Sequence, residues 1–255
     1  METTTLLGVE VDCVTMAQAV DRLWDVLRAP DYGCAYVVTP NLDHARLLEE
    51  RTDLRAAYAD AALRVVDGMP LVWASWLFRK PVRERVAGSD LVPELLASAS
   101  PARRDRPLSF YLLGAAPGVA ERAAEPLLAL SPHLAFAGCY SPPFGFEHDD
   151  GENERIATRI AEAAPDVLVL GLGAPKQELW VHRHRHQLHT KLALCVGATI
   201  DFFAGEVRRA PPLVRAVGLE WAHRMVADPK RLIPRYGRDA LALPRLLYAD
   251  LRARR

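Results

Sequence analysis

The sequence is poor in several features that mark common protein classes. Its four cysteines (Cys13, Cys34, Cys139 and Cys195) are far apart and show no metal-ligand spacing, which favours buried, reduced thiols over a disulfide framework or a zinc site. No apolar run approaches the roughly 18–20 residues that span a bilayer, and Met1–Gly8 lacks a basic start. We therefore expect neither a transmembrane helix nor a cleaved signal peptide.

Two binding motifs are missing as well. The chain has no Asp-x-Asp, the pattern with which many nucleotide-sugar enzymes hold a divalent cation, so the sequence gives no support for a metal on a diphosphate. A complete Gly-x-Gly-x-x-Gly is also missing. After Gly171 and Gly173 there is no third glycine, and Gln177 stands there at a different offset. This disfavours a dinucleotide-binding oxidoreductase.

A histidine cluster raises the question of a metal site, but its surroundings disfavour one. Arginines interleave with the histidines, and no carboxylate or cysteine completes a ligand set in that segment, so a solvated basic helix face is the better interpretation. The clustered residues are His182, His184, His186 and His189.

Charge is distributed unevenly along the chain, although the 255 residues carry no net charge. Residues 206–255 hold eleven arginines and one lysine against five acidic residues, a net charge of +7, so the rest carries −7. Such asymmetry indicates a C-terminal segment suited to an anionic surface: phospholipid, pyrophosphate or nucleic acid.

Short apolar runs alternate with helical patterns along residues 1–205, which predicts βαβ units and a parallel sheet. We expect an α/β, Rossmann-like domain, with a mostly parallel sheet flanked by helices and two halves that meet near 101–107. Residues 206–255 are expected to form a basic helical appendage. The expected strands are Leu6–Val11, Ala35–Val38, Leu63–Val66, Ser109–Leu113, Leu134–Cys139, Val167–Leu170 and Leu192–Val196. The expected helices include Leu42–Ala62, a buried Met69–Phe78, one capped by Ser89, Ile156–Ala164 and Gln177–Gln187.

Polar or glycine clusters follow nearly every expected strand. Ligands of parallel sheets sit beyond the carboxyl ends of the strands, so these clusters predict a binding site on one edge of the sheet. They are Thr39/Asn41, Asp67, Gly114, Tyr140, Gly171–Gln177 and Gly197–Asp201. The Gly171–Gly173 turn before a helix offers free N–H groups for a phosphate.

Several of these residues have both a chemical and a capping interpretation. Asp67 is either a general base at the sheet edge or the N-cap of the next helix. Thr39 and Asn41 either orient a sugar hydroxyl or cap a helix. Lys176 lies in a first helical turn, where the dipole disfavours a cation, so a bound anion would account for it. Asp201 either accepts from a ribose or caps a helix.

Taken alone, the sequence around Gln177 and around Arg85 predicts solvent-exposed side chains. The segment Arg208–Pro212 forms a basic corner that its two prolines make rigid.

The C-terminal segment has two apolar stripes among its arginines: Leu213, Val217, Trp221 and Met225, and then Leu243, Leu247 and Leu251. This pattern suits either a helix lying on an anionic membrane or a helix packed on the domain. A nucleic-acid-binding tail is a third interpretation, but the segment lacks a binding motif and stacking aromatics.

Taken together, the motifs resemble the WecG/TagA/CpsF glycosyltransferases (glycosyltransferase family 26), in the order of that family, from about residue 6 to 236. The matching segments are Thr39–Asn41, Val66–Gly68, Glu84–Asp90, Leu113–Gly114, Gly171–Glu178, Asp201–Gly205, Arg209–Pro211, Gly218–Trp221, Arg224 and Asp228–Arg231.

The resemblance implies an inverting, metal-independent hexosyltransferase without a cofactor. Its UDP-sugar donor would carry N-acetylmannosamine or the uronic acid of that sugar. Its acceptor would be a sugar on undecaprenyl pyrophosphate at the cytoplasmic face of the membrane, in the synthesis of a cell-surface polysaccharide such as teichoic acid. The C-terminal segment would touch the anionic membrane, no nucleic acid would bind, and a homo-oligomer stays open.

The resemblance also implies the site. Asp67 is the base and Thr39 and Asn41 assist it. Substrate would contact Arg85, Gly114, Tyr140, Gly171, Gly173, Lys176, Gln177, Asp201, Arg209, Arg224 and Arg231. Two departures stand out: Gly197–Ile200 replaces a more glycine-rich run, and Lys230 stands where arginine is common.

Overall fold

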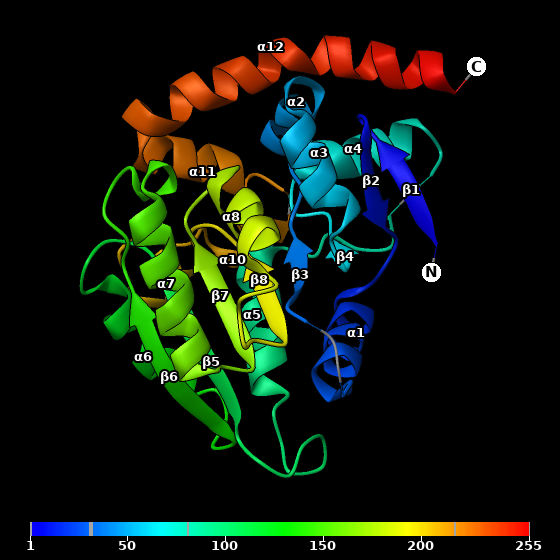
Figure 1. Cartoon of the computed structure of the whole chain (residues 1–255). Coiled ribbons are helices and arrows are strands. Elements are labelled where there is room, and N and C mark those ends of the chain that lie inside the picture. Colours follow the sequence, from blue (N-terminus) through cyan, green and yellow to red (C-terminus); the bar gives the residue numbers. More distant parts are fainter. Residues whose placement is uncertain (1, 31–32, 81, 217, 255) are drawn as a thin grey trace.

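Parallel strands form the central sheet of the molecule (Figure 1). The computed structural model describes residues 2–30, 33–80, 82–216 and 218–254, with the backbone only at 212 and 216. Within these residues the sheet has six strands in the order β4-β3-β8-β7-β5-β6, and every neighbouring pair is parallel. The strands are β3 (Ala35–Val38), β4 (Leu63–Arg64), β5 (Leu108–Gly114), β6 (Leu134–Tyr140), β7 (Val167–Gly171) and β8 (Leu192–Cys195). The predicted α/β, Rossmann-like class is confirmed.

The central strands are buried on both faces, which explains their nearly continuous Val and Leu sequences. Successive side chains point to opposite faces, so Leu168 and Leu170 join one apolar core while Val167 and Val169 join the other. Helices cover both faces. The first core receives α2 (Leu42–Glu50), α3 (Thr52–Ala59), α4 (Met69–Leu77), α7 (Asp150–Ala163) and α8 (Lys176–His184). The second receives α1 (Met16–Arg28), α5 (Gly88–Ala97), α6 (Val119–Leu128) and α9 (Thr199–Phe203).

The N-terminus forms a two-stranded antiparallel hairpin, and the single strand predicted over Leu6–Val11 was wrong. Strands β1 (Thr3–Leu6) and β2 (Val9–Asp12) are joined by Leu7 and Gly8. Both turn residues have positive φ angles, 51° and 78°, as a two-residue turn between twisted antiparallel strands requires.

Three predicted helices differ in detail. The helix expected over Leu42–Ala62 is broken at Arg51, whose extended backbone separates α2 from α3. The N-cap of α5 is Ala87 rather than Ser89, and Gly88 is the first residue of the helix. A Cβ on Gly88 would lie 2.8 Å from Val196 Cγ1. Helix α4 is buried on one side only, although its sequence is apolar all round. A short 3₁₀ helix, η1 (Phe146–His148), lies in the loop before α7.

The C-terminal segment consists of α10 (Pro212–Ala216), α11 (Glu220–Ala227) and the long α12 (Pro229–Ala253). Val217 of the first predicted stripe lies outside the described residues. Helix α12, red in Figure 1, continues through Tyr236 and Gly237 and crosses the molecule above α2, α3 and α4. Its inner side chains, among them Leu232, Ala242 and Leu246, are buried.

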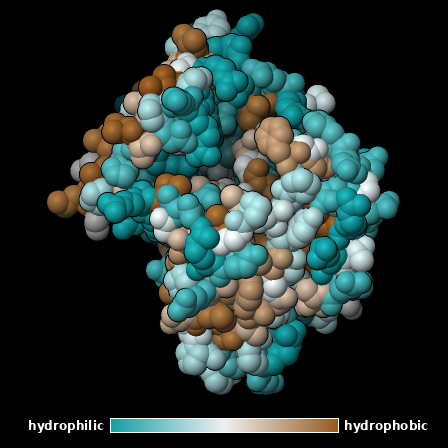
Figure 2. All heavy atoms as spheres, turned by 90° about the vertical axis from the view of Figure 1, so that its left-hand side faces the viewer, coloured by the Kyte–Doolittle hydropathy of each residue, from teal (hydrophilic) through white to brown (hydrophobic). Residues whose placement is uncertain are grey.

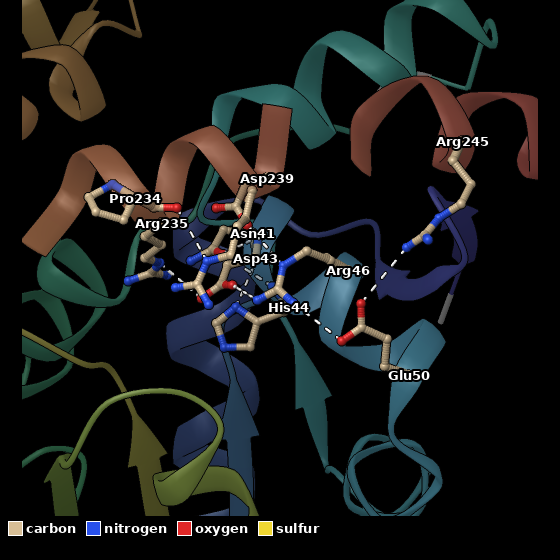
Figure 3. Close-up of polar contacts among 10 residues, drawn as sticks. Asn41, Asp43, His44, Arg46, Glu50, Pro234, Arg235, Asp239 and Arg245 are labelled. Atoms are coloured by element: carbon tan, nitrogen blue, oxygen red, sulfur yellow. Dashed lines mark hydrogen bonds and ion pairs between the residues drawn. The ribbon is translucent and has the colours of Figure 1, made fainter. Parts of the chain in front are cut away.

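Ion pairs fasten α12 to α2 (Figure 3). Arg46 lies between Asp43 and Asp239, at 2.6 Å and 3.2 Å, and Arg235 is 2.9 Å from the other oxygen of Asp43. Burial and the neighbouring Asp43 carboxylate raise the pKa of Asp239 to about 6, although Arg46 and Arg235 oppose the shift. Farther along, Arg245 reaches the acidic end of α2.

The last turns of α12 are joined to the N-terminal hairpin. The Leu7 N–H donates to the Asp250 carboxylate at 2.7 Å, and Arg254 contacts both Asp250 and the Thr5 carbonyl. Of the two interpretations of residues 237–255, packing on the domain is therefore confirmed. The division of the chain at residues 205 and 206 stays a prediction. None of the helices in the described part of the chain combines the length and the apolar character needed to cross a membrane.

Candidate active site

A cavity of about 320 Å³ lies where strands β3, β4 and β8 end, beneath α11 and α12. The space-filling view shows this side of the molecule hollowed in its upper half, with hydrophilic and hydrophobic residues on the border (Figure 2). Four of the predicted site residues line the cavity: Asn41, Asp67, Arg85 and Arg224. The cavity thus occupies the sheet edge at which the sequence predicted a site.

Asp67 lies just beyond β4, and its backbone N–H donates to the Pro40 carbonyl at 3.1 Å. Its side chain is 32% exposed and lies 3.4 Å from Arg85 Nη1. Burial raises the pKa of Asp67 and the Glu220 carboxylate adds to the rise, whereas Arg85 and Arg224 lower it. Helix α4 has no side-chain cap hydrogen bond, so the capping interpretation of Asp67 was wrong.

Asn41 caps α2, as one of its two interpretations stated. Its Oδ1 accepts from the N–H groups of Asp43 and His44. This assignment leaves the Nδ2 amide group as a hydrogen-bond donor on the cavity wall. Capping and ligand orientation are therefore compatible at this residue.

A cluster of alternating charges forms one wall of the cavity. Glu220, from the start of α11, lies 3.8 Å from Arg85 and 3.7 Å from Arg209. Arg209 also reaches Asp90 at 2.7 Å and the Ser89 hydroxyl at 2.9 Å. These pairs hold residues 206–220 against α5. Arg209 therefore joins two segments of the chain, and it does not line the cavity.

Arg224 differs from the other arginines of the wall. It lines the cavity but forms no ion pair within 4.0 Å among the described residues. Its guanidinium lies 5.5 Å from the ring centroid of Phe202, and Arg209 lies 5.6 Å from the same ring. The aromatic contact fixes the guanidinium while its N–H donors remain available, an arrangement suited to a phosphate.

Asp201 and Arg231 lie near this wall without lining the cavity. Burial raises the pKa of Asp201 and Glu206 adds to it, while Arg231 and Arg224 lower it. Helix α9 begins before Asp201, with Ala198 at the N-cap position, so the capping interpretation of Asp201 was wrong. Arg231 is exposed and pairs with Asp228 at 2.8 Å.

Gln177 belongs to a buried hydrogen-bond chain, not to the solvent-exposed face that its isolated sequence suggested. Its Nε2 donates to Glu178 at 2.8 Å, and its Oε1 accepts from the Gly197 N–H at 3.2 Å. Glu178 is fully buried and also contacts His44 Nε2 at 3.2 Å. Because His44 Nδ1 accepts from the Asn41 N–H, the chain links the cavity wall to the loop after β8.

Thr39 also holds the strand ends together. Its buried hydroxyl donates to the Cys195 carbonyl at 2.9 Å and so joins β3 to β8. The backbone at Thr39 precedes the cap of α2 and the hydroxyl does not line the cavity. Its assistance to Asp67 stays a prediction.

The glycines of the edge have a packing reason. Gly114 has a φ of +121°, and a Cβ there would lie 2.6 Å from the Gly171 carbonyl. A Cβ on Gly171 would in turn meet Ile200 at 2.9 Å. The ends of β5 and β7 and the start of α9 therefore approach closely. Gly173 has a φ of +79° with open space around it, so a close-packed neighbour does not account for that glycine.

Tyr140 and Lys176 lie farther out on the same edge. The Tyr140 hydroxyl donates to Glu152 at 2.6 Å, and Arg159 lies over its ring. Lys176 pairs with Glu147 and lies 5.1 Å from the Phe144 ring centroid. A side-chain partner thus accounts for the cation at the start of α8, and contact of either residue with a nucleoside or phosphate stays a prediction.

The histidine segment is only partly solvated. His184 is buried against Trp180, and His182 Nδ1 lies 3.1 Å from the Tyr36 hydroxyl. In the described chain no group of three or more His, Cys, Asp or Glu side chains could hold a metal ion. Three of the four cysteines are buried as expected, and Cys139 is half-buried.

Sequence reasoning missed several residues of the cavity. Glu220 and Trp221 were seen only as part of a motif, and Trp73, Phe202, Tyr236 and Asp239 were not assigned to the site. The Gly218–Trp221 motif was the available signal. A Cβ on Gly218 would lie 2.6 Å from Met69 Cγ, so this glycine lets the start of α11 close over α4.

A carboxylate and an arginine without an ion pair, at the carboxyl edge of a parallel α/β sheet, form a site suited to an enzyme that acts on an anionic substrate. Comparison with known proteins makes the class more specific. Residues 4–255 match the Glycosyl transferase WecG/TagA/CpsF family, and the chain belongs to it. It is therefore a glycosyltransferase, and neither the oxidoreductase nor the nucleic-acid interpretation is favoured.

Curated relatives of the chain include proteins of Staphylococcus aureus. An N-acetylglucosaminyldiphosphoundecaprenol N-acetyl-beta-D-mannosaminyltransferase of strain MRSA252 is 30% identical over 250 residues, covering 98% of this chain and 92% of the relative. Proteins of the same name from strains NCTC 8325 / PS 47 and COL are 29% identical with the same coverage.

Proposed function

We propose that the protein transfers N-acetylmannosamine, or its uronic acid, from a UDP-sugar to a lipid-linked sugar on undecaprenyl diphosphate. The observation that carries the proposal is the pair formed by Asp67 and Arg224, a carboxylate of raised pKa and an unpaired cation in one cavity. The relatives named above act, by their names, on an N-acetylglucosaminyl diphosphoundecaprenol acceptor.

Asp67 is the proposed general base. It takes the proton from the acceptor hydroxyl as the oxygen attacks the anomeric carbon from the face opposite UDP. Burial raises the pKa of Asp67, so its carboxylate is a stronger base than that of an exposed aspartate. The Asn41 amide donates to a sugar or acceptor oxygen and so fixes the attacking hydroxyl.

Arg224 is the proposed partner of the departing diphosphate. Negative charge grows on the leaving UDP in the transition state, and a preorganised guanidinium stabilises it without a metal. Arg85 holds Asp67 and Glu220 in place, while Arg231 and Asp201 extend the charged surface beyond Arg224. An α-linked donor attacked in this way gives a β product, the linkage named for the relatives.

The outer face of α12 is the proposed contact with the cytoplasmic side of the membrane. Leu241 and Tyr248 are exposed there, and Arg238 and Arg252 flank them. Apolar side chains among arginines suit the boundary of an anionic bilayer. Cosedimentation with anionic vesicles should fall when Leu241 and Tyr248 are replaced by serine.

A donor screen tests the activity. Purified protein receives N-acetylglucosaminyl diphospholipid and a panel of UDP-sugars, with and without EDTA. We expect transfer from UDP-N-acetylmannosamine or its uronic acid, equal in both conditions. Absence of transfer from every UDP-sugar contradicts the proposal, and loss of transfer in EDTA contradicts its metal independence.

A further inference from the structure

An apolar surface continues from the cavity between α4 and α12. On α4, Trp73, Trp76 and Leu77 are 41%, 58% and 63% exposed, although large apolar side chains are usually buried. Their i, i+3, i+4 spacing places them on one face of the helix. The apolar strip is defined here by these residues together with Leu243, Leu247 and Leu251 of α12.

The two helices border the same cavity at one end of the strip and are in contact just beyond its other end. Trp73 and Leu243 line the cavity together. Beyond the strip, the Arg254 guanidinium lies 4.4 Å from the ring centroid of Phe78, at the end of α4. Leu243, Leu247 and Leu251 follow at intervals of four residues, so they share one side of α12 over about 12 Å. The strip therefore leads from the cavity over the surface.

The opposite sides of α12 have other uses. The side toward α2 holds the ion pairs of Arg235 and Arg245, and the outer face carries Leu241 and Tyr248. The strip is distinct from both, because its residues lie between the buried face and the outer face of the helix.

We propose that the apolar strip binds the first part of the polyprenyl chain of the acceptor. This inference rests on the proposed function, which places the acceptor sugar at Asp67 in the cavity. A diphosphate links that sugar to its chain, so a chain leaving the cavity runs over an adjoining surface. The strip is apolar and continuous with the cavity at Trp73 and Leu243, and it covers the chain where the chain would otherwise meet water.

Acceptors of different chain length test the strip. N-acetylglucosamine is linked through diphosphate to C10, C15 and longer prenyl chains, and the assay is run in detergent without vesicles. In the wild type we expect KM to fall about tenfold or more from the shortest to the longer chains, with little change in kcat, because apolar contacts bind substrate and transition state equally. In a Trp76→Ser/Leu77→Ser variant, KM should lose this dependence on chain length.

A matched variant replaces Leu241 and Tyr248, on the outer face of α12, by serine. We expect it to keep the wild-type dependence on chain length and to lose binding to anionic vesicles. The strip is disproved if Trp76→Ser/Leu77→Ser keeps the full dependence on chain length, or if that variant loses only vesicle binding, since the latter assigns the surface to the bilayer.

Direct binding separates this inference from the proposed function. Undecaprenyl diphosphate is added without a donor, and its binding is measured for the wild type and for the Trp76→Ser/Leu77→Ser variant. Strip-dependent binding without sugar transfer supports the strip and contradicts the function. Transfer that is independent of chain length supports the function and overturns the strip.

Discussion

The two halves of the sheet edge differ in how their polar groups are used. At the ends of β5 and β7, Gly114 and Gly171 are in backbone contact, and Tyr140 and Lys176 have carboxylate partners. Beyond the ends of β3 and β4, Asp67 and the Asn41 amide group face a cavity that is also lined by Arg224 of α11. One half is satisfied by the fold, and the other presents groups that a ligand can use.

Motifs on one edge of a sheet therefore need not serve one purpose. In the β5–β7 half, Gly114 and Gly171 are required because the backbone and Ile200 approach closely there, whatever ligand binds. The β3–β4 half becomes a cavity only because α11 and α12 close over it.

Asp67→Asn should lower kcat about 10³-fold, within the range for loss of a general base, because the amide cannot accept the hydroxyl proton. Binding of UDP, measured by calorimetry, should change by less than about threefold, since the fold and Arg224 remain. Turnover at the wild-type level in this variant would falsify the assignment of Asp67 as the base.

Arg224→Gln should lower kcat/KM about 10²-fold through loss of a charge-assisted contact with the diphosphate. Arg22→Gln removes an exposed arginine of α1, outside both the cavity and the proposed membrane contact, and serves as the matched control. Steady-state kinetics with the preferred donor distinguish the two. Equal losses in both variants would mean that general charge, not the position of Arg224, matters.

Gly114→Ala should destabilise the protein by about 2–4 kcal/mol, because its Cβ would meet the Gly171 carbonyl at 2.6 Å and its φ is +121°. Gly237→Ala, in α12 with open space around it, should instead be neutral or stabilise by up to about 1 kcal/mol. Urea unfolding measures both. An unchanged unfolding midpoint for Gly114→Ala would remove the packing explanation of this half.

The value of kcat/KM should fall at acid pH. Asp67 must be ionised to act as a base, and burial raises its pKa, so activity falls as the pH drops through that raised value. Glu220→Gln removes a carboxylate that contributes to the rise, so the acid limb should move to lower pH. A limb that moves to higher pH contradicts the electrostatic account.

Asp239→Asn should have the smallest effect, on stability rather than turnover. The folded pKa of Asp239 is about 6, above the ordinary value, so its contribution to stability is present at pH below about 4 and is lost as pH rises through 6. From pH 4 to pH 7, the free energy of unfolding of the variant should therefore rise relative to that of the wild type by about 1–2 kcal/mol. Thermal unfolding at the two pH values measures this gain, and a difference independent of pH opposes the prediction.

Much of the fold could be predicted from the sequence because strands buried on both faces have a strong local signature. Runs such as Val167–Leu170 bounded by glycine were placed within one or two residues. The hairpin at Leu7–Gly8 and the break at Arg51 were missed, since neither interrupts the apolar pattern.

The order of residues was enough to predict the α/β class, the carboxyl edge of the sheet as the place of the site, and the motifs of a glycosyltransferase family. Each of these depends on the order of residues along the chain. Other features became known only from the tertiary structure. Gln177 is buried beside Glu178, and Arg85 lies between Asp67 and Glu220. Helix α12 packs on α2 and leaves an apolar strip beside α4. These contacts join residues far apart in sequence, and burial and charge pairing act on distance in space, which no local pattern records.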